Sequence, residues 1–222
     1  PEARVQALWT LHGVGRLRAE LIEAASRDGS AGVREQAVVL AGRRLAEDSR
    51  FGPMLVRAAS DGDARVRFCA ALELGSWTDE RAVAPLAAIA LRDGTDRWTR
   101  AAVFSGVEGR VEGFRVAVTS GRAGASVAAV GAVMEELGRL VGASSSIPVA
   151  GAWLAEACAA ARGEAWRIPA VLGLAEGLRG RIEFKGKAGA GLLATVAEAG
   201  PGVPVLEGFL RDAAATAADA AR

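Results

Sequence analysis

The chain has 222 residues, of which 51% are hydrophobic and 24% are charged. This composition is too apolar for a disordered chain and is sufficient to bury a core. The 27 basic and 26 acidic residues leave a formal net charge of +1, so no overall field attracts nucleic acid or an anionic membrane, although a local patch stays possible. We expect no nucleic-acid partner. No apolar run approaches the roughly 20 residues that a membrane-spanning helix needs.

An Asp-Gly pair recurs in the first half of the chain at a nearly constant interval. Asp28-Gly29, Asp61-Gly62 and Asp93-Gly94 are 33 and 32 residues apart (61 − 28 and 93 − 61). This period accommodates two short helices and two turns. We therefore predict that each copy consists of a first helix, a tight Asp-Gly turn and a second helix. The glycine of each turn should adopt the left-handed conformation that ends many helices.

The predicted helices follow this plan in chain order. Val5 aligns with Val33 and Val66, so the chain begins within a copy, and we expect it to be a fragment of a longer protein. Ser30, Asp63 and Thr95 or Asp96 are the expected N-caps of the second helices. First helices are predicted at 18–26, 79–91 and 111–118, and less regular helices at 125–142, 149–162, 165–179, 188–199 and 203–220.

The predicted second helix that follows the Asp61-Gly62 turn carries two apolar stripes. Val66, Cys69, Ala70 and Leu74 form one, and Phe68, Ala71 and Leu72 form the other, so we expect a helix packed between neighbours on both sides. If Leu72 faces two helices, its truncation to Ala should cost about 2–5 kcal/mol.

Proline recurs in the first helices. Pro53 and Pro85 each stand eight residues before the Asp of their turn (61 − 53 and 93 − 85), which predicts a bend in each helix. We expect one continuous domain over 1–222, with regular repeats in 1–121 and looser repeats in 122–222.

The turn motif resembles a known repeat family. Val follows the Asp after five residues and Arg after six, as in Asp28-Val33-Arg34 and Asp61-Val66-Arg67, and this resembles the short bacterial form of the HEAT repeat. The resemblance implies an all-α, right-handed α-α superhelix, a HEAT-like solenoid of about 11–12 helices. It also implies a structural ladder in which Asp28, Asp61 and Asp93 pair with Arg34 and Arg67. Thr99 stands at the next Arg position with Arg100 beside it, so the ladder stops or shifts there.

A narrower resemblance suggests the context of the chain. The segments 3–13, 33–38, 96–103 and 173–178 look like the HEAT-repeat section of planctomycete-type, membrane-bound proteins that combine a dehydrogenase-like β-propeller with a c-type cytochrome. The resemblance implies a periplasmic or secreted spacer that docks redox modules. The chain contains no Cys-x-x-Cys-His, so no haem or other cofactor is predicted.

No catalytic, cofactor-binding or metal site is predicted. His12 is the only histidine, and its position on an apolar stripe favours a packed core imidazole. Trp9 and Trp98 are expected in the core, and Cys69 and Cys158 are expected to be free thiols. Arg43, Arg44, Arg97 and Arg100 are the candidates for an interaction surface.

Two function hypotheses follow from these observations. The first is a non-catalytic scaffold whose concave surface, lined by the second helices, holds a protein module. The alternative is a HEAT-like DNA-binding protein or an alkylpurine DNA glycosylase-type enzyme, in which Asp96, Arg97 and Trp98 would act in a basic groove. The balanced charge disfavours the alternative, because nucleic-acid binding requires clustered Lys and Arg. The identity of the protein partner and the oligomeric state stay open.

Overall fold

The computed structural model describes residues 1–161, 163–186 and 189–220. Within these ranges the chain is all-helical and contains no strand. The α-helices are α1 (Glu2–Gly13), α2 (Ala19–Ala25), α3 (Ala31–Arg44), α4 (Phe51–Ala58), α5 (Ala64–Ser76), α6 (Val83–Asp93), α7 (Arg97–Ser105), α8 (Val111–Gly121), α9 (Val127–Ser144), α10 (Ile147–Ala159), α11 (Arg167–Arg179), α12 (Gly189–Ala197) and α13 (Val203–Ala220). Two 3-10 helices span Glu80–Ala82 and Ile182–Phe184.

The described residues thus form thirteen α-helices, more than the 11–12 expected. The weakest predicted segment, α8, forms a helix because Phe114 and Val118 lie one turn apart and are both buried. None of the described helices combines the length and the apolar character needed to cross a bilayer.

The chain divides into two compact units, Pro1–Ala125 and Ser126–Arg222. The change from regular to looser repeats that the sequence predicts after residue 121 lies close to this division. The prediction of one continuous domain over 1–222 stays a prediction.

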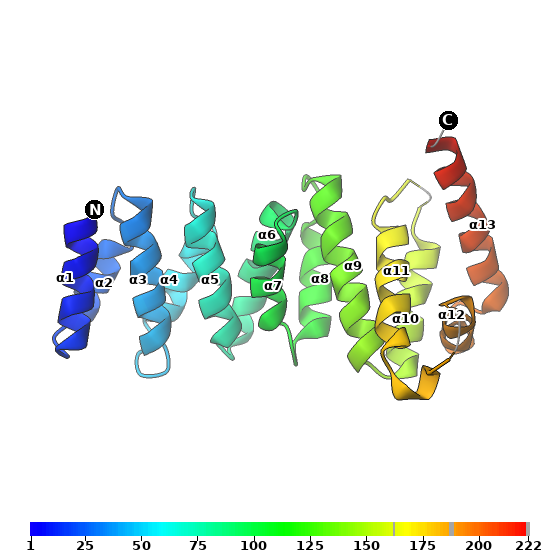
Figure 1. Ribbon diagram of the computed structural model, residues 1–222, viewed down its shortest axis with the longest axis horizontal. Helices are drawn as coiled ribbons and strands as arrows, with labels where there is room; N and C mark the ends of the chain where they lie inside the picture. The colour runs from blue at the N-terminus through cyan, green and yellow to red at the C-terminus, as the bar shows by residue number, and fades with distance from the viewer. Residues whose placement is uncertain (162, 187–188, 221–222) are drawn as a thin grey trace. The chain divides into compact units, whose positions relative to one another are not determined.

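The first unit is an α-solenoid of two layers. The second helices α3, α5 and α7 lie side by side with α1, and the first helices α2, α4 and α6 lie behind them (Figure 1). Helices contact their neighbours in chain order: α3 packs on α1, α2, α4 and α5, and α5 packs on α6 and α7. This local contact pattern is typical of repeat proteins.

The core of this unit confirms most of the two predicted stripes, including Ala71, which is fully buried. Val66, Ala70 and Leu74 are fully buried, as the i, i+4, i+8 spacing predicts. Leu72, in contrast, is 42% exposed, so the prediction that it packs between two helices is wrong. A second helix has neighbours on its flanks and first helices behind it, which leaves its remaining side in solvent.

The backbone conformation of the Asp-Gly turns differs from the prediction. Gly29, Gly62 and Gly94 are not among the glycines with positive φ, and Gly94 has φ −65°, so the predicted left-handed caps are absent. The N-cap prediction holds for Asp63 and Asp96, whose side chains accept backbone N–H groups, whereas Ser30 makes no such bond. The turns are closed by arginine side chains instead, as described below.

The two recurring prolines lie in the first turns of their helices and not in the helix interiors. Pro53 and Pro85 are each the third residue of an α-helix, in α4 and α6. The N–H groups of a first turn have no partner within the helix, so proline is tolerated there without a kink.

Glycine contacts organise the second unit. Helices α9 and α11 pack closely, with Gly138 and Gly142 of α9 set against Gly173 and Gly177 of α11. A Cβ atom at Gly177 would lie 2.1 Å from the carbonyl oxygen of Arg139. Only glycine allows the two backbones to approach this closely. Helix α10 packs on α9, α11 and α12, and α13 packs on α12 and α10.

Candidate functional site

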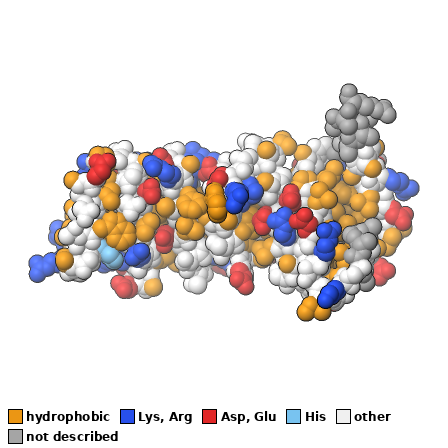
Figure 2. All heavy atoms as spheres, in the orientation of Figure 1, with side chains coloured by type: hydrophobic (Ala, Val, Ile, Leu, Met, Phe, Trp, Pro, Cys, Tyr) orange, Lys and Arg blue, Asp and Glu red, His pale blue; other side chains and the backbone are white. Residues whose placement is uncertain are grey.

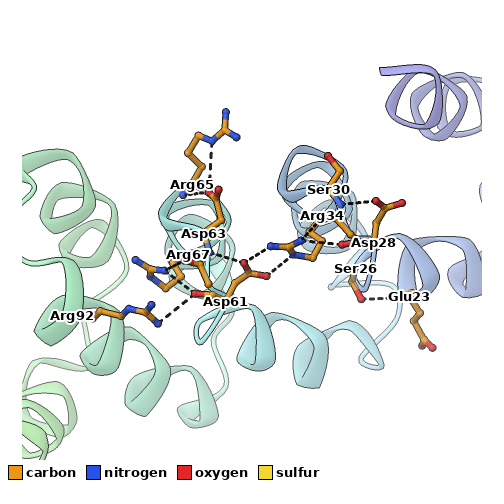
Figure 3. A network of polar contacts seen from close by, with 12 residues as sticks. Glu23, Ser26, Asp28, Ser30, Arg34, Asp61, Asp63, Arg65, Arg67 and Arg92 are labelled. Atoms are coloured by element: carbon orange, nitrogen blue, oxygen red, sulfur yellow. Dashed lines mark hydrogen bonds and ion pairs between the residues drawn. The ribbon is translucent and has the colours of Figure 1, made fainter. Parts of the chain in front are cut away.

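The predicted ladder is present in the first unit. The Arg34 guanidinium donates to both carboxylate oxygens of Asp61 at 2.7 and 2.8 Å. Arg67 does the same to Asp93, with both bonds at 2.6 Å. Each pair joins one repeat to the next with the parallel geometry that makes Arg–carboxylate pairs strong. Figure 3 shows the pair of Arg34 and Asp61.

Each ladder arginine also closes the turn of its own repeat. Arg34 donates to the carbonyl oxygen of Asp28 at 2.9 Å, and Arg67 donates to that of Asp61 at 2.7 Å (Figure 3). The Asp61 side chain in turn accepts the backbone N–H of Asp63 at 2.9 Å. One arginine therefore satisfies carbonyl groups that the helix end leaves free, which a left-handed glycine would otherwise do.

One rung of the ladder, formed by Arg4, was not predicted from the sequence. For the position of Thr99 and Arg100, the sequence did not decide whether the ladder stops or shifts. Arg4 contacts Asp28 at 2.8 Å, so Arg4 occupies the ladder position, and the alignment of Val5 with Val33 is wrong by two residues. Arg100 donates to the carbonyl oxygens of Gly94 and Thr95 at 2.6 and 3.2 Å. The turn of the fourth repeat is thus closed by an arginine one residue later, and no Asp–Arg rung from Arg100 is seen among the described residues. The intervals from Arg to Asp, 24, 27 and 26 residues (28 − 4, 61 − 34, 93 − 67), were the available signal.

The ladder keeps its groups charged. The hydrogen bond from Arg34 lowers the pKa of Asp61, and the bond to Asp61 raises the pKa of Arg34. The bond to Asp93 likewise raises the pKa of Arg67, whose side chain is only 5% exposed. These groups hold the repeats together and offer no free base or nucleophile.

A second series of arginines, which the sequence analysis did not detect, ties the opposite ends of the second helices. Arg44 donates to the carbonyl oxygen of Leu17 at 2.8 Å, and Arg110 donates to that of Trp77 at 2.8 Å. Arg181 of the second unit donates to that of Ser145 at 2.7 Å. Two arginines proposed for an interaction surface, Arg44 and Arg100, are therefore bound to the backbone.

The solvent-facing sides of α1, α3, α5 and α7 form a surface that we call the second-helix face. Trp9, Val39 and Leu72 share one repeat position on it, since Arg4, Arg34 and Arg67 precede them by five residues (9 − 4, 39 − 34, 72 − 67). Trp98, predicted to be buried, is 62% exposed on α7. It lies in the first turn of its helix, 33 residues after the exposed Arg65 (98 − 65).

Arginines cover the two tryptophans of this face. The guanidinium carbon of Arg97 lies 4.3 Å from the Trp98 ring centroid, and that of Arg43 lies 5.0 Å from the Trp9 ring. Trp9 donates its indole N–H to Gln36 at 2.9 Å. His12 meets the Trp9 ring edge-on at 5.6 Å and is half-buried rather than a core residue. Figure 2 shows hydrophobic and basic side chains mixed on this side of the first unit.

Two further groups on α5 are half-buried. Burial raises the pKa of Cys69 to about 11, so its thiol is protonated at neutral pH, and both Cys69 and Cys158 are free. Burial also raises the pKa of Glu73. Its carboxylate occupies the space that a Cβ atom at position 42 would need, which the glycine there leaves free. Among the described residues no cluster of His, Cys, Asp and Glu could hold a metal ion.

Asp96 is engaged in its helix cap. Its carboxylate accepts the backbone N–H of Thr99 at 2.7 Å and the Thr99 hydroxyl at 2.8 Å, and these bonds lower its pKa. The acidic residue that the glycosylase alternative requires is thus bound within the turn.

Comparison with known families agrees with this geometry. Residues 1–107 match the family model of HEAT repeats. No curated protein and no solved structure matches the chain. The HEAT match covers α1 to α7, and every rung of the ladder lies within it. HEAT repeats generally serve as non-catalytic scaffolds, which agrees with the engaged state of the ladder groups. The multidomain redox context stays a prediction.

Proposed function

We propose that this chain is a non-catalytic scaffold that binds a protein through its second-helix face. The observation that carries the proposal is the exposed Trp98 with Arg97 stacked on its ring at 4.3 Å. Trp and Arg are the residue types that most often dominate binding energy at protein interfaces. Here they stand on a surface that also exposes Leu72.

The ladder supports this role mechanically. Each bidentate pair fixes the spacing of two neighbouring second helices, and the buried core beneath them holds their rotation. A face that is ordered before binding loses less conformational entropy when a partner docks.

The partner that we propose is an adjoining module of a longer redox protein, placed in the periplasm or secreted. This finer assignment is supported by the resemblance of the segments 3–13, 33–38, 96–103 and 173–178 to dehydrogenase–cytochrome proteins. It predicts that the flanking gene sequence encodes Cys-x-x-Cys-His.

Site-specific photocrosslinking tests the face. A benzophenone amino acid would replace Leu72 or Trp98 in the full-length protein, and the exposed Ala24 of α2 would serve as the control. We expect both test positions to crosslink to one discrete protein or module, identified by mass spectrometry, and the control not to. Equal labelling at all three positions, or none, would contradict the proposal.

Nucleic acid is the competing outcome. Salt-dependent binding of DNA below about micromolar concentration, abolished by R97Q, would replace the protein assignment with the alternative.

A further inference from the structure

A groove lies in the layer of first helices, between α4 and α6. Its volume is about 610 Å³, within the range of roughly 300–1,000 Å³ typical of ligand sites. We call it the α4–α6 groove, and its lining includes Pro53, Val56, Arg57, Trp77, Arg81 and Ala88. It is built from first helices and their loops, so it is distinct from the second-helix face.

The groove exists because one repeat has a tryptophan where its neighbours have a bridging arginine. Trp77 stands 33 residues after Arg44 and 33 before Arg110 (77 − 44 and 110 − 77), the two arginines that bridge to backbone carbonyls. In place of such a bridge, the indole packs on α4, where a Cβ at Gly52 would lie 2.6 Å from the ring. The exposed Ala84 and Ala88 on α6 are too small to fill the space beside it.

The charges of the groove are cationic, and one of them is free. Arg81 stacks over the Trp77 ring at 5.0 Å and donates to both carboxylate oxygens of Asp79 at 2.7 and 2.9 Å. Arg81 lowers the pKa of Asp79 to about 2, so this pair stays ionised and neutral overall.

Arg57 differs from Arg81. It is exposed, and its one hydrogen bond among the described residues goes to the carbonyl oxygen of Pro53, at 3.3 Å, within its own helix. In the part of the chain that the structure describes, no carboxylate forms an ion pair with it. No Asp or Glu lines the groove.

We propose that the α4–α6 groove binds an acidic peptide segment in which an apolar side chain stands next to Asp or Glu. The apolar side chain enters the space beside Trp77 and Val56, where it removes apolar surface of both partners from water. The neighbouring carboxylate pairs with Arg57, which supplies the unmatched positive charge. A basic segment would instead meet the unmatched guanidinium group of Arg57 and be repelled.

Fluorescence anisotropy with short labelled peptides tests this proposal on the full chain. The probe is Gly-Glu-Leu-Glu-Gly, blocked at both ends, and the matched probes carry Gln or Lys in place of Glu, or Ala in place of Leu. We expect the Glu–Leu peptide to bind most tightly and the Lys peptide not to bind. R57Q should weaken binding about two- to fivefold, as expected for an exposed ion pair.

A second variant blocks the groove without touching the core. A88E places a carboxylate on the exposed face of α6 and should abolish binding, whereas A101E on the exposed side of α7 should not. R97Q is the matched control for R57Q, since it removes the same charge from the second-helix face. Circular dichroism confirms that each variant is folded.

Three results would overturn the proposal. They are no binding of the Glu–Leu peptide up to about 1 mM, equal binding of the Glu, Gln and Lys peptides, and unchanged binding by both R57Q and A88E. None of these results bears on the second-helix face, because the crosslinking experiment uses positions on α5 and α7.

Discussion

At the scale of single residues, the Asp–Arg pairs of the ladder contribute unequally to the free energy of unfolding. Arg67 is almost fully buried and bonds to Asp93 and to two carbonyl oxygens. Arg4 makes a similar pair with Asp28, but its side chain is 56% exposed. Water screens the outer rung and not the inner one, so burial decides what each pair contributes.

Truncation of the two arginines should therefore differ in its effect. We expect R67A to lower the free energy of unfolding by about 3 kcal/mol or more, because it leaves a partly buried carboxylate and two carbonyls unpaired. R4A should cost less than about 1 kcal/mol. Urea unfolding followed by circular dichroism measures both, and equal losses would show that the rungs are equivalent.

The pKa of Glu73 is raised by burial, which is opposite to the shift of the ladder carboxylate Asp61. A carboxyl group whose pKa is raised in the folded state destabilises it at pH values above that pKa, and the penalty disappears as the pH falls through it. Asp61 contributes the reverse: its stabilisation is present above the unfolded pKa of about 3.9 and is lost in stronger acid.

E73Q should consequently stabilise the protein at pH 7. The gain should shrink as the pH falls and vanish below about pH 4, where a glutamate is protonated in both states. Thermal unfolding at several pH values gives the comparison, with E47Q at an exposed position as a control expected within about 0.5 kcal/mol of wild type. A gain that is independent of pH would show that desolvation is not the cause.

At the scale of elements, glycine decides how closely helices pack. The α9–α11 contact places backbone against backbone at Gly138, Gly142, Gly173 and Gly177. A side chain there meets carbonyl oxygens and amide groups, which cannot rotate away. A helical glycine at which an added Cβ would meet nothing, such as Gly208, has no such role and only lowers helix propensity.

Two alanine substitutions separate these roles. G177A should destabilise the protein by about 1–3 kcal/mol or more, because it forces α9 and α11 apart. G208A in α13, where an added Cβ meets nothing within 4 Å, should stabilise it by about 0.5–1 kcal/mol. Chemical denaturation provides both values, and destabilisation by G208A would show that another segment packs against α13 at Gly208.

At the scale of the whole molecule, each unit holds its own core. The ladder, both tryptophan–arginine pairs of the second-helix face and the α4–α6 groove all belong to residues 1–125. In a repeat array, stability is the sum of contacts between neighbouring repeats. The first unit should therefore not depend on distant parts of the chain.

We expect residues 1–125 produced alone to be helical and to unfold cooperatively in urea, and to keep the peptide affinity of the full chain. Circular dichroism and the anisotropy measurement test these points. A fragment that is helical but melts without a transition would show that its repeats need residues 126–222.

The sequence by itself determined the features that repeat locally. The 33- and 32-residue intervals between Asp-Gly pairs located the turns and helices of the regular repeats, because this signal lies within one repeat and its neighbour. The resemblance to HEAT repeats implied the rungs Arg34–Asp61 and Arg67–Asp93, which the structure contains. Only the tertiary structure decided which apolar side chains outside the buried stripes face solvent. Trp98, Leu72 and Trp77 are apolar in sequence, but their exposure depends on whether another helix lies against them, and no local pattern carries that information. The arginine–carbonyl bridges and the glycine contacts join segments that are brought together by packing, so they are visible only once the helices are stacked.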